Sequence, residues 1–268
     1  MTPTKVFTLT AFVTIAALAS VAFINATHLK KPAANSKGIA VVELFTSEGC
    51  SSCPSADELV ARIQKEDNDK PVYILAFHVD YWNRLGWKDV FSSADYSKRQ
   101  NDYANYLNLQ SVYTPQIVVN GKTEFVGSQE GTLRNAIRAS LDKTPAAQLT
   151  LTATGFNQSK AIINYSIEGV EKNSVLLLAA VQKSAQTRVE RGENGGHTLS
   201  HVQIVRKLQT VNLNSKSGLV EMALPHGFNS QNWEMIGILQ NTINGTITGA
   251  SKVSFVTEAN ATTIKSSE

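Results

Sequence analysis

The sequence predicts an α/β domain over residues 39–144, followed by an all-β, sandwich-like domain over residues 145–268. In the first half, apolar runs alternate with stretches in which apolar residues recur at helical spacing, which is the pattern of an α/β domain. After Thr144-Pro145 the helical spacing ends, and short segments typical of strands take over. We therefore expect two domains of different architecture.

The first half contains, in order, a strand, a helix, a strand, a helix, two strands and a helix. Pro54 suits the first turn of the first helix, because an N–H at that position has no intrahelical partner. Asn120-Gly121 suits a tight hairpin turn between the paired strands, because both residues tolerate positive φ. The predicted segments are residues 39–45, 55–64, 72–79, 95–109, 116–120, 122–126 and 131–141.

The second half contains seven short segments with strand-like alternation. Seven such strands favour a sandwich, and an immunoglobulin-like module is one form that it could take, although the Cys pair and Trp spacing of a true immunoglobulin domain are missing. The predicted strands are residues 148–154, 161–168, 174–183, 200–213, 219–223, 233–240 and 247–255.

Composition narrows the class of protein. The 268 residues are 42% apolar, 7% aromatic and 18% charged, which excludes a polytopic membrane protein, a low-complexity chain and a disordered charged tail. The formal net charge is +3, and no long Lys/Arg block concentrates it on one segment. We therefore expect no nucleic-acid partner.

Residues 1–26 have the features of an export signal. Lys5 gives a positively charged start, an apolar run over residues 6–24 follows, and small residues that suit cleavage come near its end. The run is also about as long as a membrane-spanning helix, so an uncleaved N-terminal anchor is the alternative. Residues 27–38 form a polar lead-in. We expect a periplasmic or secreted protein, with membrane contact only if the segment stays uncleaved.

The chain has only two cysteines, Cys50 and Cys53. They lie between the first predicted strand and the first predicted helix, so Cys50 falls at or just before a helix N-terminus. Free N–H groups and the helix dipole at such a position raise the thiolate fraction of a cysteine. Two intervening residues let a second thiol resolve a mixed disulfide made by the first. We expect Cys50 to be the attacking thiol and Cys53 the resolving thiol.

Thr114-Pro115 directly precedes the predicted hairpin, and a proline at this position favours a cis peptide bond. The order of elements, the Cys-x-x-Cys motif and the Thr-Pro pair together resemble the thioredoxin superfamily. That resemblance implies a thiol-disulfide oxidoreductase without a bound cofactor, in which Pro115 is the cis-proline. The backbone beside Thr114 would then pair with an extended peptide. The residue before the first cysteine is Gly49, where thioredoxin has Trp.

Five strings of the sequence are similar to the bacterial secreted family known as domain of unknown function 1223. They are VELFTSEGCSSCP (residues 42–54), AFHVDYW (76–82), LGWKD (85–89), YTPQ (113–116) and RGENGGHTLSH (191–201). The resemblance extends over nearly the whole mature chain. Because no activity is settled for this family, it implies a fold rather than a reaction.

Glu43 and His78 are supporting candidates. Glu43 lies among apolar residues of the first predicted strand, where a buried carboxylate with a raised pKa would accept the proton of the resolving thiol. The alternative is an exposed or salt-bridged acid. His78 ends the second predicted strand, where an α/β sheet often presents ligands. It either tunes Cys50, binds a metal or is simply hydrogen-bonded in place.

Trp82, Leu85 and Trp87 are expected to form a small hydrophobic lid, which either covers the thiols or packs on the domain. Trp82 and Trp87 are thus candidates for contact with substrate.

Residues 191–201 form a glycine-rich polar loop, a type of segment in which function tends to concentrate. This loop either reaches the Cys site or pairs only with itself. Gly195-Gly196 argues against the helix that would bring two of its histidines onto one metal ion, so we expect no metal site here. The candidate contact residues of the loop are Arg191, Glu193, Asn194, His197 and His201.

These observations predict an exported thiol-disulfide oxidoreductase that acts on a protein or small-thiol partner and needs no cofactor. The second half would present substrate or anchor the enzyme to a partner. Two alternatives stay open. One is a non-enzymatic binding module in which Cys50 and Cys53 form a structural disulfide. The other is a copper-delivery protein in which the thiolates and His78 hold Cu(I).

Overall fold

A computed structural model describes residues 38–157, 159–169 and 172–255. The predicted export signal and all but the last residue of the polar lead-in lie outside the described residues. Within the described ranges, no helix is long and apolar enough to cross a membrane.

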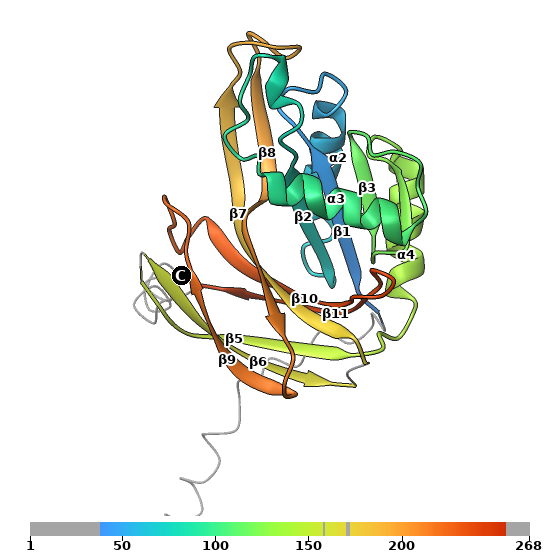
Figure 1. Ribbon diagram of the computed structural model, residues 1–268, viewed down its shortest axis with the longest axis vertical. Coiled ribbons are helices and arrows are strands. Elements are labelled where there is room, and N and C mark those ends of the chain that lie inside the picture. Colours follow the sequence, from blue (N-terminus) through green and yellow to red (C-terminus); the bar gives the residue numbers. More distant parts are fainter. Residues whose placement is uncertain (1–37, 158, 170–171, 256–268) are drawn as a thin grey trace, which may run out of the picture. The chain divides into compact units, whose positions relative to one another are not determined.

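The first half has the predicted order of elements (Figure 1). Pro54 opens the first helix, and the Ser93 hydroxyl accepts the Asp95 N–H at the start of the next one. The elements are β1 (Ala40–Thr46), α2 (Pro54–Glu66), β2 (Val72–His78), the 3₁₀ turn η1 (Asn83–Leu85), α3 (Ala94–Tyr106), β3 (Gln116–Val119), β4 (Thr123–Val126) and α4 (Glu130–Leu141).

The hairpin turn between β3 and β4 is formed as the sequence predicts. Asn120 and Gly121 both have positive φ, at 50° and 65°. A Cβ atom on Gly121 would lie 1.9 Å from the carbonyl oxygen of Gly245, so both the backbone conformation and the close approach require glycine.

All seven strands predicted in the second half are present. Their bounds are β5 (Gln148–Phe156), β6 (Lys160–Glu168), β7 (Ser174–Arg188), β8 (Thr198–Asn212), β9 (Ser217–Ala223), β10 (Trp233–Asn241) and β11 (Ile247–Ser254).

The strands of the two halves join in one sheet. Eight strands follow the order β11-β10-β7-β8-β2-β1-β3-β4, and β5, β6 and β9 form a separate three-stranded sheet. The two halves meet where β8 pairs with β2, with Ala76 opposite Ile204. Because β1 and β2 are parallel whereas β1 and β3, β3 and β4, and the pairs among β7, β8, β10 and β11 are antiparallel, the large sheet is mixed.

The predicted fold class is therefore wrong, since the chain is not an α/β thioredoxin-like domain followed by an all-β sandwich-like domain. The described residues, 38–157, 159–169 and 172–255, belong to one compact unit around the shared sheet. The physical reason lies in β7 and β8, which have 15 residues each, or about 50 Å of extended chain, enough to reach from the small sheet to the edge of β2. Residue periodicity predicts strands but does not show which strand edges pair.

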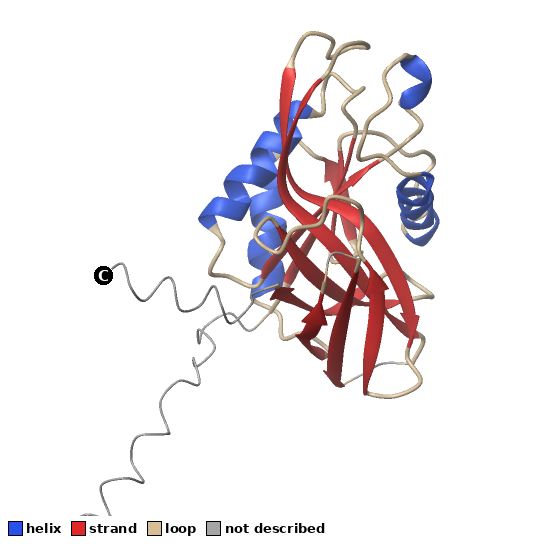
Figure 2. Cartoon of the chain, turned by 90° about the vertical axis from the view of Figure 1, so that its left-hand side faces the viewer, coloured by secondary structure: helices blue, strands red, loops and turns tan. Residues whose placement is uncertain are grey.

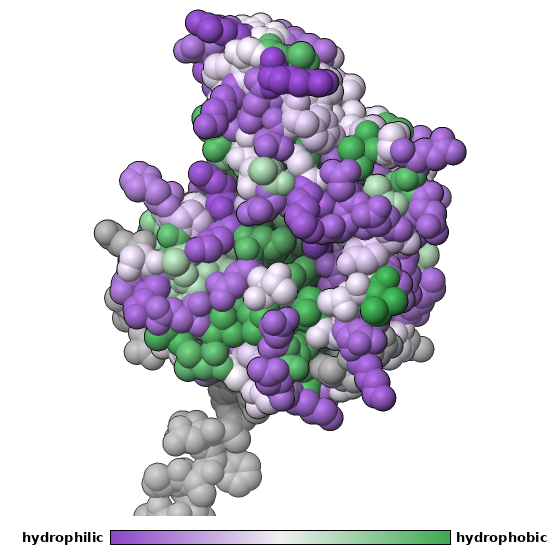
Figure 3. Space-filling view, in the orientation of Figure 1, coloured by the Kyte–Doolittle hydropathy of each residue, from purple (hydrophilic) through white to green (hydrophobic). Residues whose placement is uncertain are grey.

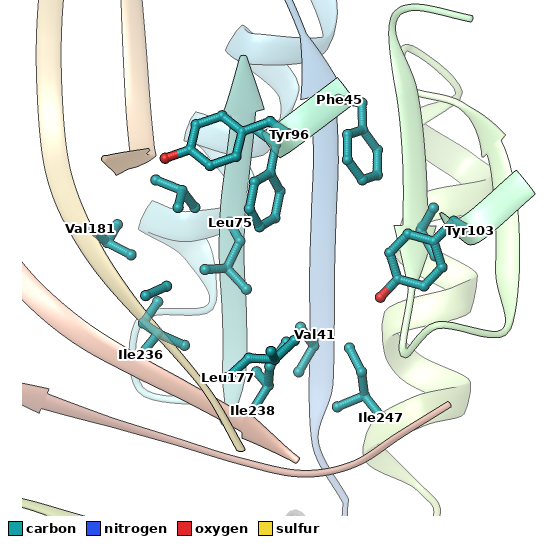
Figure 4. Packing of buried hydrophobic residues seen from close by; sticks show 14 of the residues in the cluster. Val41, Phe45, Leu75, Tyr96, Tyr103, Leu177, Val181, Ile236, Ile238 and Ile247 are labelled. Carbon is teal, nitrogen blue, oxygen red and sulfur yellow. The ribbon is translucent and has the colours of Figure 1, made fainter. Parts of the chain in front are cut away.

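Helices and the small sheet cover the large sheet. Helices α2 and α4 pack on one face of β1, and α3 packs on the other (Figure 2). Figure 4 shows the cluster on the α3 side, which contains Phe45 and Tyr103 as well as residues of β7 and β10, with Leu75 between Phe45 and Val181. Successive residues of β7 alternate between this cluster and a second one under the small sheet, so this strand is buried on both faces.

The long hairpin of β7 and β8 carries residues 189–197 at its tip, at the end of the sheet where β1 and β2 also terminate. On the face drawn in Figure 3, hydrophilic residues dominate the upper end, and apolar residues gather lower down.

Candidate functional site

The two cysteines form a disulfide at the start of α2, with their Cα atoms 5.4 Å apart. Cys53 is the N-cap residue of the helix, and its carbonyl oxygen accepts the N–H groups of Ala56 and Asp57. The Cys53 N–H in turn donates to the Cys50 carbonyl over 3.2 Å. The predicted position of the pair, between β1 and the first helix, is thus confirmed.

The tip of the β7–β8 hairpin closes over this disulfide. The Asn194 amide donates to the carbonyl oxygens of both Glu48 and Cys50, each over 2.9 Å. Glu193 accepts the Ser51 N–H over 2.9 Å, and hydrogen bonds from Ser51 hold the pKa of Glu193 below its ordinary value. The Cys50 side chain is only 1% exposed and that of Cys53 is fully buried. The hairpin tip is thus hydrogen-bonded to the backbone of the loop that carries the two buried cysteines.

Trp82 and the Thr114-Pro115 segment flank the loop that carries the two cysteines. The Trp82 indole N–H donates to the Thr114 hydroxyl over 2.8 Å, and a Cβ atom on Gly49 would meet the Trp82 Cβ at 3.2 Å. The Thr114–Pro115 peptide is cis, as expected. Pro115 and Ala56 each come within 3.0 Å of a Cβ built on Gly127, so Pro115 lies beside the first turn of α2.

Trp87 does not simply pack in a hydrophobic lid. Its indole N–H donates to Glu48 Oε2 over 2.7 Å, and the neighbouring Leu85 is 47% exposed. Trp87 therefore holds one oxygen of a buried carboxylate two residues before Cys50.

The loop over residues 47–53, which carries both cysteines, is called the Cys loop. Beneath it lies a buried cluster of ionisable side chains: Glu48, Asp57, His78, Asp89 and His201. His201 lies between two carboxylates, with Nε2 3.6 Å from Glu48 Oε1 and Nδ1 3.6 Å from Asp57 Oδ1. His78 Nδ1 is 2.7 Å from Asp89 Oδ2, and the two imidazole rings meet edge to face at 4.8 Å.

Charge neighbours set the protonation of this cluster. Burial alone would lower the pKa of His201, but the carboxylates of Asp57 and Glu48 outweigh it and raise that pKa to about 9. Burial likewise would raise the pKa of Asp89, yet His78 and backbone N–H groups hold it below its ordinary value. In the free protein, the cluster thus keeps a positive charge among buried acids at neutral pH.

Glu43 is not brought to this site. Its carboxylate accepts hydrogen bonds from Arg99, at 2.6 and 2.9 Å, and from the Tyr103 hydroxyl, all on the α3 side of the sheet. It is salt-bridged, as one alternative expected, but it is fully buried rather than exposed.

Within the polar loop, the side chains of Arg191 and His197 are exposed, whereas Asn194 and His201 are buried. The structure thus gathers Cys50, Cys53, Trp82, Trp87, Thr114, Pro115, His78, Glu193, Asn194 and His201 around one site.

Glu48, Asp57 and Asp89 were not predicted from the sequence. Asp57 had a detectable signal, since it is an acid on a short helix whose other buried positions are apolar. Glu48 and Asp89 stand inside the quoted family strings but have no periodicity that marks them as buried.

The fold and site together define a mixed-sheet protein with a Cys-x-x-Cys disulfide placed over a buried carboxylate–histidine cluster. The chain belongs to the family described as protein of unknown function (DUF1223), whose model matches residues 41–240. Comparison with curated proteins gives no match.

Two solved structures are similar to this chain. Protein AGR_C_4864 from Agrobacterium tumefaciens has a TM-score of 0.64 and 27% identity, over 82% of this chain and 95% of that one. HBP35 of Porphyromonas gingivalis has a TM-score of 0.58 and 16% identity, over 82% of this chain and 76% of that one. The second likeness concerns the fold alone.

Proposed function

We propose that the protein exchanges thiols and disulfides through Cys50 and Cys53, as an exported oxidoreductase that acts on a protein or small-thiol partner. The observation that carries this proposal is the disulfide closed across two residues at the N-terminus of α2. Backbone N–H groups and the helix dipole at that end stabilise a thiolate. A periplasmic or extracellular location, reached through the predicted export signal, lets such a pair stay oxidised or cycle.

The exchange has two steps. A substrate thiolate attacks Cys50 Sγ, the bond between Cys50 and Cys53 breaks, and Cys53 leaves as a thiolate that takes up a proton. A second substrate thiolate then attacks the substrate sulfur of the mixed disulfide and releases Cys50. Two substrate thiols are oxidised to a disulfide and the Cys pair is reduced; the reverse sequence reduces a substrate disulfide.

Two features around the pair support a peptide-sized substrate. Trp82 and Thr114 are joined by a hydrogen bond beside the Cys loop, and Pro115 lies against the first turn of α2. The loop over residues 189–197 is hydrogen-bonded to the backbone of residues 48–51, so its opening would uncover the segment that carries the cysteines.

The test is the equilibrium of the Cys pair with glutathione, together with mixed-disulfide trapping. We expect the wild-type pair to equilibrate with a glutathione buffer. In Cys53→Ser, Cys50 should trap a stable mixed disulfide, and Cys50→Ser should trap much less. A folded protein whose pair stays oxidised in reduced glutathione, with no adduct in either variant, would contradict the proposal.

A structural disulfide in a non-enzymatic binding module is the second candidate. The burial of both cysteine side chains and the two hydrogen bonds from Asn194 favour it. A loop this short, however, gives a disulfide only about 2 kcal/mol of loop-closure stabilisation. An inert pair, combined with a loss of stability of that size in a Cys50→Ser, Cys53→Ser double variant, would support this candidate.

The copper-delivery alternative requires His78 to act with the thiolates. Within the described residues, the grouping capable of holding a metal joins His78 to Asp57 and His201 instead.

A further inference from the structure

We propose that Asp57, His78 and His201 bind a divalent transition-metal ion, for which Zn²⁺ is the expected occupant. The site lies in the interior beneath the Cys loop, and its ligands do not include the cysteines. The proposal goes beyond thiol-disulfide exchange and does not depend on it.

The first step is the position of the donor atoms. One ligand atom from each of Asp57, His78 and His201 lies within 4.8 Å of the other two. Asp57 Oδ1 and His201 Nδ1 are 3.6 Å apart. Two ligands about 2.1 Å from a tetrahedral zinc ion are about 3.4 Å apart, so this pair already has the required spacing. A ligand atom as far away as 4.8 Å would have to come about 1.4 Å closer to reach that spacing.

None of these atoms makes a hydrogen bond. Asp57 Oδ1, His78 Nε2 and His201 Nδ1 are buried and without a hydrogen-bond partner among the described residues, although Asp57 Oδ1 and His201 Nδ1 face each other at 3.6 Å. The parent side chains are 4%, 0% and 2% exposed. Burying a polar atom without a hydrogen-bond partner is destabilising, and three such atoms lie close together here. A bound cation would satisfy all three at once.

In His78 and Asp57, the polar atom that would not bind the metal is held by a hydrogen bond. His78 places Nδ1 against Asp89, and the Asp57 Oδ2 atom accepts the Thr46 hydroxyl over 2.9 Å. A proton on His78 Nδ1 leaves the lone pair on Nε2, the nitrogen that makes no hydrogen bond. Histidine ligands of metals almost always donate their second N–H to a carboxylate, carbonyl or water in this way.

His201 has a looser form of this arrangement. Its Nε2 lies 3.6 Å from Glu48 Oε1 without a hydrogen bond between them, and Glu48 Oε2 is held by the Trp87 indole. Each histidine thus has a carboxylate near one nitrogen, and one donor atom of each ligand lies within 4.8 Å of the other two. One carboxylate and two imidazoles form a ligand set that suits Zn²⁺ and other first-row divalent ions.

A proton on His201 is the competing explanation. An imidazolium between Glu48 and Asp57 would account for both His201 nitrogen atoms. It leaves His78 Nε2 without a partner, because that ring has its other nitrogen on Asp89. A metal ion accounts for all of these atoms together.

The experiment uses the full chain without a histidine tag, with its disulfide intact and after removal of metals by a chelator. Co²⁺ is titrated while its visible absorption is recorded, and Zn²⁺ is then added in competition with a coloured chelator. We expect one Co²⁺ per chain with a nitrogen-ligand spectrum, displaced by one Zn²⁺. His78→Ala and His201→Ala should bind Zn²⁺ at least about 100-fold more weakly, and Asp89→Asn about 10- to 100-fold more weakly.

The matched controls are His197→Ala and His226→Ala, which remove exposed histidines and should bind as the wild type does. If a buried variant fails to fold, imidazole NMR of the wild type decides, since Zn²⁺ should shift only His78 and His201 of the five histidines. Absence of one-to-one binding to the oxidised wild type would overturn the proposal. The proposal would also be overturned if His197→Ala and His226→Ala weakened binding as much as the buried variants do. The same holds if binding appeared only after reduction of the disulfide and were lost in the Cys50→Ser, Cys53→Ser double variant.

Discussion

Replacing Asn194 with alanine should release the loop over residues 189–197 and speed up reduction of the disulfide. The Asn194 amide makes two hydrogen bonds of 2.9 Å, to the carbonyls of Glu48 and Cys50. At about 0.5–1.5 kcal/mol net for each bond, the pair holds the loop by about 1–3 kcal/mol. Because every 1.4 kcal/mol is tenfold in population, the open form and the reduction rate should rise about 5- to 150-fold.

The assay measures the second-order rate of reduction by dithiothreitol, with alkylation and mass spectrometry at timed points. Glu190→Ala removes an exposed side chain of the same loop and should react at the wild-type rate. Urea denaturation of each protein separates loop opening from global unfolding. If folded Asn194→Ala is reduced no faster than Glu190→Ala, the loop does not control access to Cys50 and the reasoning is refuted.

Three further predictions concern the fold. Arg99→Met should lower the free energy of unfolding by about 3–5 kcal/mol, since it leaves the fully buried Glu43 carboxylate without its cation. Urea denaturation measures the loss. A second Glu43→Gln change should recover part of it, which would not happen if the loss came from an unrelated packing defect. Gly121→Ala should lower the free energy of unfolding by more than about 1 kcal/mol, because φ is 65° and the Gly245 carbonyl oxygen lies 1.9 Å from the new Cβ. Gly131→Ala on α4 meets nothing within 4 Å and should raise the free energy of unfolding by up to about 1 kcal/mol. Equal melting temperatures for the two variants would contradict this prediction. Burial raises the pKa of Tyr81 to about 12 from its ordinary value of 10.0, so the folded state binds more protons than the unfolded state between these values. The Tyr81 contribution to stability is therefore complete below pH 10 and lost as pH rises through 12. In urea denaturation, the free energy of unfolding of Tyr81→Phe should fall less steeply with rising pH than that of the wild type. The same fall for both proteins would contradict this prediction.

Local structure was predictable wherever a residue acts on its own segment. Pro54 fixes the start of α2, and Asn120-Gly121 fixes a turn that needs positive φ at both positions. The apolar runs of β1 and β7 also show that these strands are buried. Such signals depend on chain neighbours, and they predict element positions well.

Assembly was not predictable in the same way. The pairing of β8 with β2 joins residues 128 positions apart, Ala76 and Ile204, and no local pattern marks it. The same limit applies to Glu43, whose partner Arg99 lies on another element across the α3 face. The candidate site was accordingly predictable only in part. The Cys motif, Thr114-Pro115 and the polar loop have sequence signals. The convergence of Asp57, His78 and His201, in contrast, depends on which strands pair in the large sheet.

The two hydrogen bonds of Asn194 also impose an order on maturation. Cys50 and Cys53 are only three positions apart, and the ribosome completes both of them well before it adds residues 189–197. An emerging chain therefore displays its sulfur pair to the surrounding oxidants and reductants while the segment that later seals it has not been synthesised. The Cys pair can therefore meet oxidants and reductants before the β7–β8 hairpin has folded against the segment that carries it.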